Sequence, residues 1–225
     1  MRSRSPIRAV FFDLDDTLCD TIGTREARAR LAFDAIARER PDLTRETFVA
    51  RVMERVGERI VRGVPAVAEE LGLLRTEAGR RAIGTWFFVG CIELLRPFKS
   101  VTETVEGLSS AYKLGVITNG DGKLQRFKWL QLNLGIDLLV ISAECGFEKP
   151  DQRIFEQACS LAGVEPREAV FVGDRLDVDV AGSKAAGMQA VWFNHWGGSL
   201  DEAPTAPDAV ISRFEDLPAA LATMV

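Results

Sequence analysis

The sequence has little histidine and few cysteines, and both shortages limit the sites that it can build. Its one histidine, His195, excludes a metal centre made from several imidazoles. The four cysteines are far apart and form no CxxC pair, so we do not expect a disulfide framework. Reduced, scattered thiols are typical of the cytosol, and we therefore expect a cytoplasmic protein.

Long apolar runs and a strong excess of one charge are also missing. No stretch approaches the roughly 20 apolar residues of a membrane span. The residues before the first strand contain no apolar run of signal length and are interpreted as a short loose tail. The net charge of -5 gives no indication of a nucleic-acid or acidic-membrane partner. The 225 residues, 47% of them hydrophobic, suffice for one or two domains with a proper core.

Six short apolar runs, rich in β-branched and aromatic residues, predict strands. Their apolar residues are continuous rather than alternating, as in strands covered on both faces. Helical patterns lie between them, so right-handed crossovers and an α/β fold with a Rossmann-like, doubly wound parallel sheet are predicted. The predicted strands are 7–13, 112–119, 137–143, 169–174, 190–194 and 208–212, and the predicted helices are 101–111, 122–134, 151–162 and 178–187.

The stretch between the first two strands has a different pattern, with no convincing strand. Thr44 has the character of a helix N-cap, and Gly63-Val64-Pro65 is interpreted as a break. An all-helical domain over 20–98 is therefore predicted, inserted into an α/β core domain that comprises 1–19 and 99–225. Its predicted helices are 24–40, 44–62, 65–74 and 76–95.

Polar residues follow several of the predicted strands, where a doubly wound sheet holds its ligands. Several buried carboxylates at one edge need compensation, because an uncompensated buried charge costs several kcal/mol. Mg²⁺ is a suitable partner, since it binds one or two carboxylates together with phosphate oxygens and water. The residues that the pattern brings to this edge are Asp13, Asp15, Thr118, Asn119, Gly120, Lys149, Asp174, Asp177 and Asp179.

Four motifs in this set occur in an order that resembles a known family. "DLDDT", "ITNG", "EKPD" and "GDRLDVD" resemble the four motifs of the haloacid dehalogenase-like (HAD) hydrolase superfamily. The helical insertion resembles that family's C1-type cap. The segment 117–158 resembles the subgroup that contains nucleotide 5'-phosphatases and sugar-phosphate phosphatases. The resemblance implies a Mg²⁺-dependent phosphatase that hydrolyses a small phosphorylated metabolite through an aspartyl-phosphate.

The same resemblance implies roles for the acidic residues. Asp13 would be the nucleophile, and Asp15 would be the general acid toward the leaving oxygen and then the general base for water. The metal ligands would be the side chains of Asp13 and Asp174 and the backbone carbonyl of Asp15. Asp179 would lie beside the metal, through water or through its pair with Lys149.

It also implies roles for the residues that would bind the phosphoryl group. Thr118 would donate a hydrogen bond to it, with the backbone of Asn119 and Gly120 nearby. Lys149 would neutralise its charge and orient the nucleophile. Thr17 would brace the turn that carries the general acid.

Several conspicuous residues have ordinary interpretations that we favour over functional ones. Asp16 is interpreted as a turn or cap residue, and Asp177 as the N-cap of the helix 178–187 rather than a metal-shell residue. Cys19 is interpreted as a small, semi-buried filler, because nearby carboxylates disfavour a thiolate. His195 is interpreted as a loop residue, and Trp86 as part of the core of the helical domain.

Two alternatives to the phosphatase remain open at this point. One is a phosphomutase of the β-phosphoglucomutase type, which the motifs do not separate from a phosphatase. The other is a catalytically idle HAD-like binding module, which the intact motif residues disfavour.

Arg25 and Arg28 are candidate substrate contacts, with solvated surface arginines as the alternative. The sequence indicates neither the substrate nor the oligomeric state.

Overall fold

The structure, a computed structural model, describes residues 6–56, 62–201 and 203–224 and has two compact units. The core unit comprises Met1–Cys19 with Pro97–Val225, and the helical unit comprises Asp20–Arg96. Most of the predicted N-terminal tail lies outside the described residues. The helical unit ends two residues earlier than the predicted limit at 98, because Pro97 and Phe98 pair with the turn after the first strand. Cys19 forms a bridge with Pro97, and the Phe98 N–H donates to the Leu18 carbonyl at 3.1 Å.

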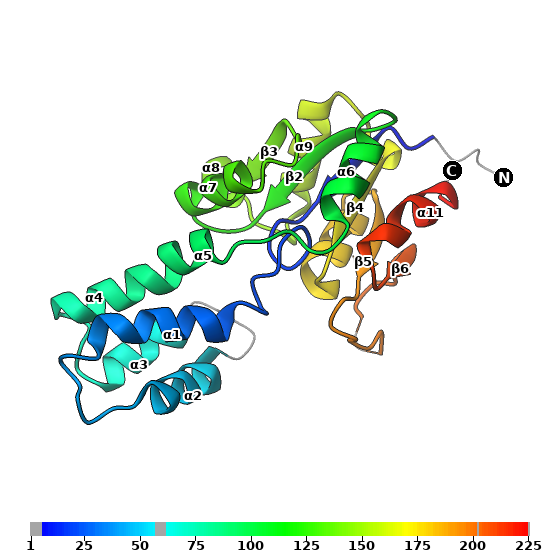
Figure 1. Cartoon of the computed structure of the whole chain (residues 1–225). Helices are drawn as coiled ribbons and strands as arrows, with labels where there is room; N and C mark the ends of the chain where they lie inside the picture. The colour runs from blue at the N-terminus through cyan, green and yellow to red at the C-terminus, as the bar shows by residue number, and fades with distance from the viewer. Residues whose placement is uncertain (1–5, 57–61, 202, 225) are drawn as a thin grey trace. The chain divides into compact units, whose positions relative to one another are not determined.

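The core unit is built on one parallel sheet of six strands, in the order β3-β2-β1-β4-β5-β6 (Figure 1). All six predicted strands are confirmed. The central strand β1 has the sequence AVFF and is buried along its whole length, as expected for a strand between two layers of helices. The strands are β1 (Ala9–Phe12), β2 (Lys113–Thr118), β3 (Leu138–Ile141), β4 (Ala169–Gly173), β5 (Gln189–Phe193) and β6 (Ala209–Ile211).

Neighbouring residues of β1 face opposite helical layers. On one face, Phe11 belongs to a buried cluster with Phe155 of α9 (Gln152–Ala162) and Phe171 of β4; the rings of Phe155 and Phe171 meet edge to face at 5.1 Å. On the other face, Phe12 meets Phe214 at 6.0 Å, close to α6 (Val101–Ser109) and α11 (Leu217–Ala222), which lie next to each other in Figure 1. Helices on both faces confirm the doubly wound architecture.

The predicted helices of the core unit are present. Asp121 and Asp151 begin two of them, since each side chain accepts a hydrogen bond from a first-turn N–H. These helices are α6 (Val101–Ser109), α7 (Gly122–Leu132), α9 (Gln152–Ala162), and a π-helical segment Leu176–Val180 followed by α10 (Ala181–Ala185). In the described part of the core unit, four short helical segments were not predicted: α8 (Ser142–Cys145), the 3₁₀ turns Pro166–Glu168 and Phe214–Asp216, and α11 (Leu217–Ala222).

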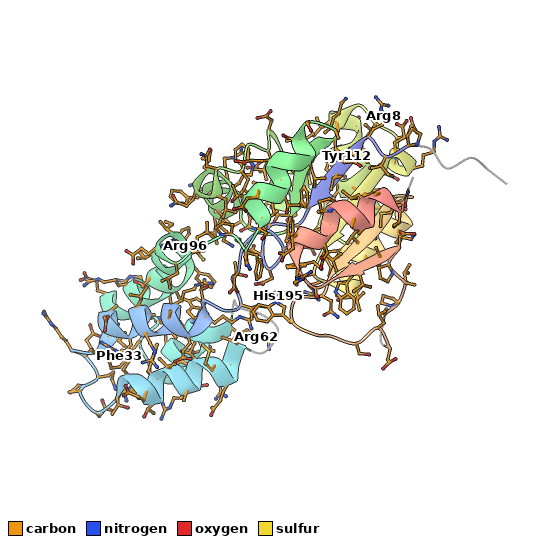
Figure 2. All side chains as sticks on the ribbon, turned by 45° about the vertical axis from the view of Figure 1, so that its right-hand side comes forward. Arg8, Phe33, Arg62, Arg96, Tyr112 and His195 are labelled. Atoms are coloured by element: carbon orange, nitrogen blue, oxygen red, sulfur yellow. The ribbon has the colours of Figure 1, made fainter. Side chains whose placement is uncertain are left out.

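The helical unit packs its helices around an apolar core that includes Phe33, Phe48 and Trp86. Phe33, labelled in Figure 2, meets Phe48 at 5.7 Å between ring centroids. The Thr44 hydroxyl accepts from the Thr47 N–H at 3.2 Å, which confirms the predicted cap. The helices are α1 (Arg25–Ile36), α2 (Arg45–Val56), α3 (Gly63–Glu70) and α4 (Glu77–Gly84), followed by a π-helical segment Thr85–Val89 and α5 (Gly90–Glu93).

The break predicted in the helical unit is not where the sequence pattern put it. The predicted break at 63–65 is wrong, since α3 begins at Gly63. Pro65 is its third residue, where a missing N–H costs no helical hydrogen bond. The predicted helix 44–62 is seen as far as Val56, and residues 57–61 lie outside the described part of the chain.

Arg28 is buried, so its interpretation as a solvated surface arginine is wrong. The side chain is 1% exposed and donates from Nε and Nη2 to the Trp86 carbonyl, at 3.0 and 2.6 Å. Its guanidinium carbon also lies 4.8 Å from the Trp86 ring centroid. Within the described residues, no helix combines the length and the apolar character needed to cross a membrane.

Candidate active site

The carboxyl ends of the three central strands lie together, because β2, β1 and β4 are neighbours in the sheet. Asp13 directly follows β1, and its N–H donates to the Val172 carbonyl of β4 at 2.9 Å. Thr118 is the last residue of β2, and Asp174 directly follows β4. Three segments that are far apart in sequence thus deliver their polar residues to one edge.

Three carboxylates form a compact acidic cluster at this edge. Asp13, Asp174 and Asp179 each offer one oxygen atom, and these atoms lie within 4.8 Å of one another. Burial, with a contribution from Asp179, raises the pKa of Asp13 to about 7 although Lys149 opposes the shift. Burial and the charges of Asp179 and Asp13 raise the pKa of Asp174 to about 9. The cluster therefore has fewer positive charges than carboxylates, and its oxygen donors fit a divalent cation.

Lys149 is the cation that the protein itself places in the cluster. Its Nζ lies 2.8 Å from Asp13 Oδ1 and 2.7 Å from Asp179 Oδ1, and the side chain is almost completely buried. Burial lowers the pKa of Lys149, but Asp13 and Asp179 raise it by more, so the net pKa is above its ordinary value. Asn119 fixes the backbone of Lys149 through two hydrogen bonds. The Lys149 N–H donates to Asn119 Oδ1 at 2.8 Å, and Asn119 Nδ2 donates to the Lys149 carbonyl at 2.9 Å.

Gly173 allows Asp179 to approach the end of β4. A Cβ atom at this position would lie 2.5 Å from the Asp179 side chain. Asp179 is fully buried, and its Oδ2 accepts from the Arg175 N–H at 3.0 Å. The glycine is thus a condition for the packing of the cluster.

Asp15 is bound by two residues of α7 that sequence reasoning missed. Lys128 Nζ lies 2.7 Å from Asp15 Oδ1, and Gln125 Nε2 donates to Asp15 Oδ2 at 2.7 Å. Gln125 Nε2 also donates to Thr118 Oγ1 at 2.6 Å. Lys128 thus balances the charge of Asp15. Gln125 and Lys128 are three residues apart, hence on one helix face, but nothing in the local sequence marks that face as the buried one.

Gly120 has a backbone conformation that favours glycine, with φ at +139°. A Cβ atom here would lie 3.2 Å from the Gln125 side chain, so the glycine lets Gln125 pass. The Gly120 N–H donates to the Ser142 hydroxyl at 3.0 Å, a second contact that sequence reasoning missed. Its predicted contact with a phosphoryl group stays a prediction.

The structure also decides most of the ordinary interpretations. Asp16 lies in a turn with φ at +60°, as predicted. Cys19 is buried, and burial, with a contribution from Asp15, raises its pKa well above the usual range, which confirms an inert filler. Thr17 lies 3.5 Å from Asp174 through its hydroxyl, and its bracing role stays a prediction. His195 packs against the Phe98 ring at 4.6 Å.

The interpretation of Asp177 as a helix N-cap is wrong. The helical segment begins at Leu176, so Asp177 is its second residue and not its cap. Its exposed carboxylate pairs with Arg175 at 2.8 Å. Within the described residues, Asp177 is not part of the acidic cluster either.

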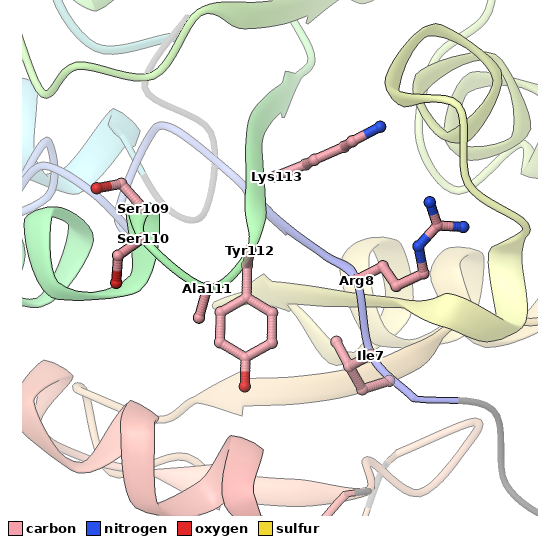
Figure 3. Close-up of a pocket in the computed structure, with 7 residues that line it drawn as sticks. All are labelled: Ile7, Arg8, Ser109, Ser110, Ala111, Tyr112 and Lys113. Carbon is pink, nitrogen blue, oxygen red and sulfur yellow. The ribbon is translucent and has the colours of Figure 1, made fainter.

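A shallow pocket of about 310 Å³ lies at the opposite edge of the sheet, where β1 and β2 begin (Figure 3). Its two cationic side chains are engaged within the core unit. Arg8 pairs with Glu168 at 3.1 Å, and Lys113 donates to the Ala162 carbonyl at 2.7 Å. The chemistry-bearing residues are therefore at the other edge. The pocket is lined by Ile7, Arg8, Ser109, Ser110, Ala111, Tyr112 and Lys113.

Comparison with known proteins places this arrangement in a family. The model of the haloacid dehalogenase-like hydrolases matches residues 7–187. Glyceraldehyde 3-phosphate phosphatase of Methanothermobacter thermautotrophicus is 35% identical over 197 residues, covering 84% of this chain and 86% of that protein. N-acylneuraminate-9-phosphatase of Rattus norvegicus is 30% identical over 235 residues, covering 96% and 94%.

Solved structures agree with the sequence relatives. The 2-haloacid dehalogenase of Pseudomonas syringae pv. Tomato superposes with a TM-score of 0.69 at 30% identity, covering 97% of this chain and all of that one. A HAD phosphatase of Thermococcus onnurineus gives a TM-score of 0.67 at 25% identity, covering 96% and 98%. With the four motifs, the sheet and the family match in agreement, the chain belongs to the haloacid dehalogenase-like hydrolases.

Proposed function

We propose that the protein is a Mg²⁺-dependent phosphatase that hydrolyses a small phosphomonoester through a phosphorylated Asp13. The observation that carries the proposal is a second carboxylate, Asp15, held two residues from Asp13 beside the acidic cluster. The family resemblance implies that this second aspartate is the acid for the leaving oxygen, a group that haloacid dehalogenases proper do not need. The curated relatives reported above are named as phosphatases, which supports the same conclusion.

The reaction divides into two displacements at phosphorus. In the first, an Asp13 carboxylate oxygen attacks, the ester P–O bond breaks, and the leaving oxygen takes a proton from protonated Asp15. In the second, water attacks the phosphoryl group and gives a proton to Asp15. The bond between Asp13 and phosphorus breaks, and inorganic phosphate leaves. Lys149 holds Asp13 and offers positive charge where the phosphoryl oxygens gather.

The acidic cluster is the site that we assign to Mg²⁺. Asp13 and Asp174 would hold the ion with the Asp15 carbonyl, and Asp179 would stand beside it, paired with Lys149. The bound ion would supply charge stabilisation to the phosphoryl oxygens. The raised pKa values of Asp13 and Asp174 support this assignment, because burial and mutual repulsion raise them and a bound cation offsets both effects.

The substrate class is proposed from the relatives, which are named for the phosphates of a triose and of a sialic acid. We propose a phosphorylated sugar or a similar small metabolite. The helical unit is proposed to select it, as the resemblance to a C1-type cap implies. Nucleoside monophosphates and phosphoglycolate belong in the same screen, because the residues of the core unit would contact only the phosphoryl group.

The first experiment measures hydrolysis of p-nitrophenyl phosphate at near-neutral pH, with Mg²⁺ and with excess EDTA. Turnover that requires Mg²⁺ is expected, followed by preference for one member of a panel of phosphorylated metabolites. Folded protein without metal-dependent turnover on any member would rule out the phosphatase and favour an idle binding module. Release of inorganic phosphate, rather than formation of an isomeric sugar phosphate, separates a phosphatase from a phosphomutase.

A further inference from the structure

The two buried side chains of helix α7 are both polar, whereas two of its large apolar side chains are exposed. Gln125 and Lys128 are 2% and 6% exposed, whereas Phe127 and Leu130 are 44% and 61% exposed. A helix that lies on a sheet ordinarily buries an apolar stripe. Burial of an amide and an ammonium is unfavourable unless each has good partners. The inverted arrangement therefore indicates that this helix faces something other than apolar core.

The partners of the two side chains are both residues of the proposed reaction. Lys128 lies 2.7 Å from Asp15 Oδ1, and Gln125 lies 2.7 Å from Asp15 Oδ2. The Gln125 amide nitrogen also lies 2.6 Å from the Thr118 hydroxyl. One face of α7 thus contacts both the turn after β1 and the end of β2. Lys128 and Asp15 are 113 residues apart along the chain, so only the fold brings them together.

The helix is well anchored for such a role. Asp121 caps its first turn by accepting from the Leu124 N–H at 3.0 Å. Gly120, with no Cβ, leaves room for the Gln125 side chain. The pair on α7 is also separate from Lys149, which serves Asp13 and Asp179. Two lysines thus hold two different aspartates of one turn.

We propose that Gln125 and Lys128 are positioning residues that hold Asp15 and Thr118 for hydrolysis of the phosphorylated enzyme. This inference rests on the proposed phosphatase function. Both oxygens of the Asp15 side chain accept a hydrogen bond, one from Lys128 and one from Gln125. The two bonds fix the orientation of the carboxylate that is proposed to take a proton from the attacking water. Gln125 donates to the Thr118 oxygen at 2.6 Å, so the Thr118 hydroxyl must direct its own proton elsewhere. In this structure it donates to the Asn119 carbonyl at 3.4 Å, a long bond that a phosphoryl oxygen can replace.

The expected signature is slow breakdown of the phosphorylated enzyme. Lys128→Met and Gln125→Glu are expected to lower kcat for p-nitrophenyl phosphate by about 10- to 100-fold, below the roughly 10²–10⁴-fold contribution of an acid–base group itself. KM is expected to change little. Intact-protein mass spectrometry of enzyme quenched during turnover is expected to show a larger phosphorylated fraction than the wild type.

Matched controls lie on the exposed face of the same helix. Lys123→Met and Gln131→Glu make the same chemical changes at exposed positions and are expected to keep the wild-type kcat. Thermal unfolding and circular dichroism check the fold of each variant. If Lys128→Met does not fold, the near-isosteric Gln125→Glu variant and the charge-conserving Lys128→Arg variant carry the test.

A double variant separates positioning from general structural damage. In an Asp15→Asn background, Lys128→Met is expected to lower kcat by less than about twofold, because residues that act through one another are not additive. A full additional loss, or single variants with wild-type kcat and phosphorylated fraction, would overturn the inference while the phosphatase stands. Absence of turnover in the wild type would instead remove the proposed function, and this inference with it.

Discussion

The core unit and the helical unit bury different kinds of side chain. In the helical unit, the described core is apolar around Trp86 and Phe48, and its buried charge, Arg28, is held by a backbone carbonyl. The core unit instead buries ionisable groups against each other at one sheet edge. Such burial is unfavourable unless each charge is paired, which makes this edge the candidate active site. Its buried polar residues are Asp13, Thr17, Thr104, Thr118, Gln125, Lys128, Lys149, Asp179 and Ser183.

The most severe test of this division is Asp13→Asn. The variant is expected to lose more than about 10³-fold in turnover, because an amide is a poor nucleophile toward phosphorus. Folding should be preserved, since the amide oxygen can still accept from the Leu14 N–H, which lies 2.7 Å from Asp13 Oδ1. The measurements are Mg²⁺-dependent release of phosphate and the thermal unfolding midpoint. Residual turnover within tenfold of the wild type would contradict a covalent role.

A substitution in the helical unit should affect stability first. Trp86→Ala removes a fully buried ring and is expected to destabilise that unit by about 3–5 kcal/mol. Phe88→Ala, in the same π-helical segment but at a side chain 48% exposed, is the control and should change stability by less than about 0.5 kcal/mol.

Hydrogen exchange followed by mass spectrometry shows where the Trp86→Ala damage falls. Amide protection should be lost in the peptides of Asp20–Arg96 and retained in β1 and β4. Equal loss of protection in both units would show that the two cores do not behave as separate units.

Gly173→Ala tests how tightly the acidic cluster is packed. The added methyl group would collide with Asp179, so the variant is expected to weaken Mg²⁺ activation by about 10- to 100-fold, the usual cost of disturbing groups around a metal. Gly107→Ala on α6, where a Cβ meets nothing within 4 Å, is the matched control. The Mg²⁺ concentration for half-maximal turnover is the measurement, and an unchanged value would mean that Asp179 can move aside.

The smallest expected effect is the pH dependence of stability in the metal-free protein. Folding raises the pKa of Asp13 to about 7 and that of Asp174 to about 9, from 3.8. The folded state therefore binds more protons than the unfolded state between these values, so the free energy of unfolding falls as pH rises from 4 to 9. Each loss of about 1 kcal/mol should lower Tm by about 2–4 °C.

Mg²⁺ should reverse this trend, so its stabilising effect is expected to be larger at high pH than at low pH. Differential scanning calorimetry with and without Mg²⁺ checks both statements. Asp174→Asn should flatten the profile of the metal-free protein, since it removes the carboxylate whose pKa is raised furthest. A metal-free protein that becomes more stable toward pH 9 would contradict the crowding of these carboxylates.

Local pattern predicted the strands well and the short helices poorly. The continuous apolar run "AVFF" is typical of a strand that is buried on both faces, so β1 could be predicted without knowledge of its neighbours in the sheet. The helix α8 has four residues, less than the periodicity needed for recognition. Asp177 shows the same limit, because an acidic residue before a helical pattern looks like a cap, and one residue of register decides whether it is one.

The residues of the candidate site also differ in how far the sequence predicted them. Asp13, Lys149 and Asp174 could be placed at one edge because each follows or precedes a recognisable element, and parallel strands share their carboxyl edge. Gln125, Lys128 and Ser142 could not be placed there from the sequence, since only their contacts with other segments connect them to the site. Nothing local to Lys128 distinguishes it from the exposed Lys123 on the same helix.

The six strands, the helical insertion and the acidic residues at strand ends could be recognised from the sequence, because these features depend on neighbours along the chain. The contacts of α7 with Asp15 and the burial of Arg28 against Trp86 became visible in the folded protein. Whether a charged side chain can be buried depends on which partner lies opposite it. Strand order and helix packing set that partner, and neither is contained in local periodicity.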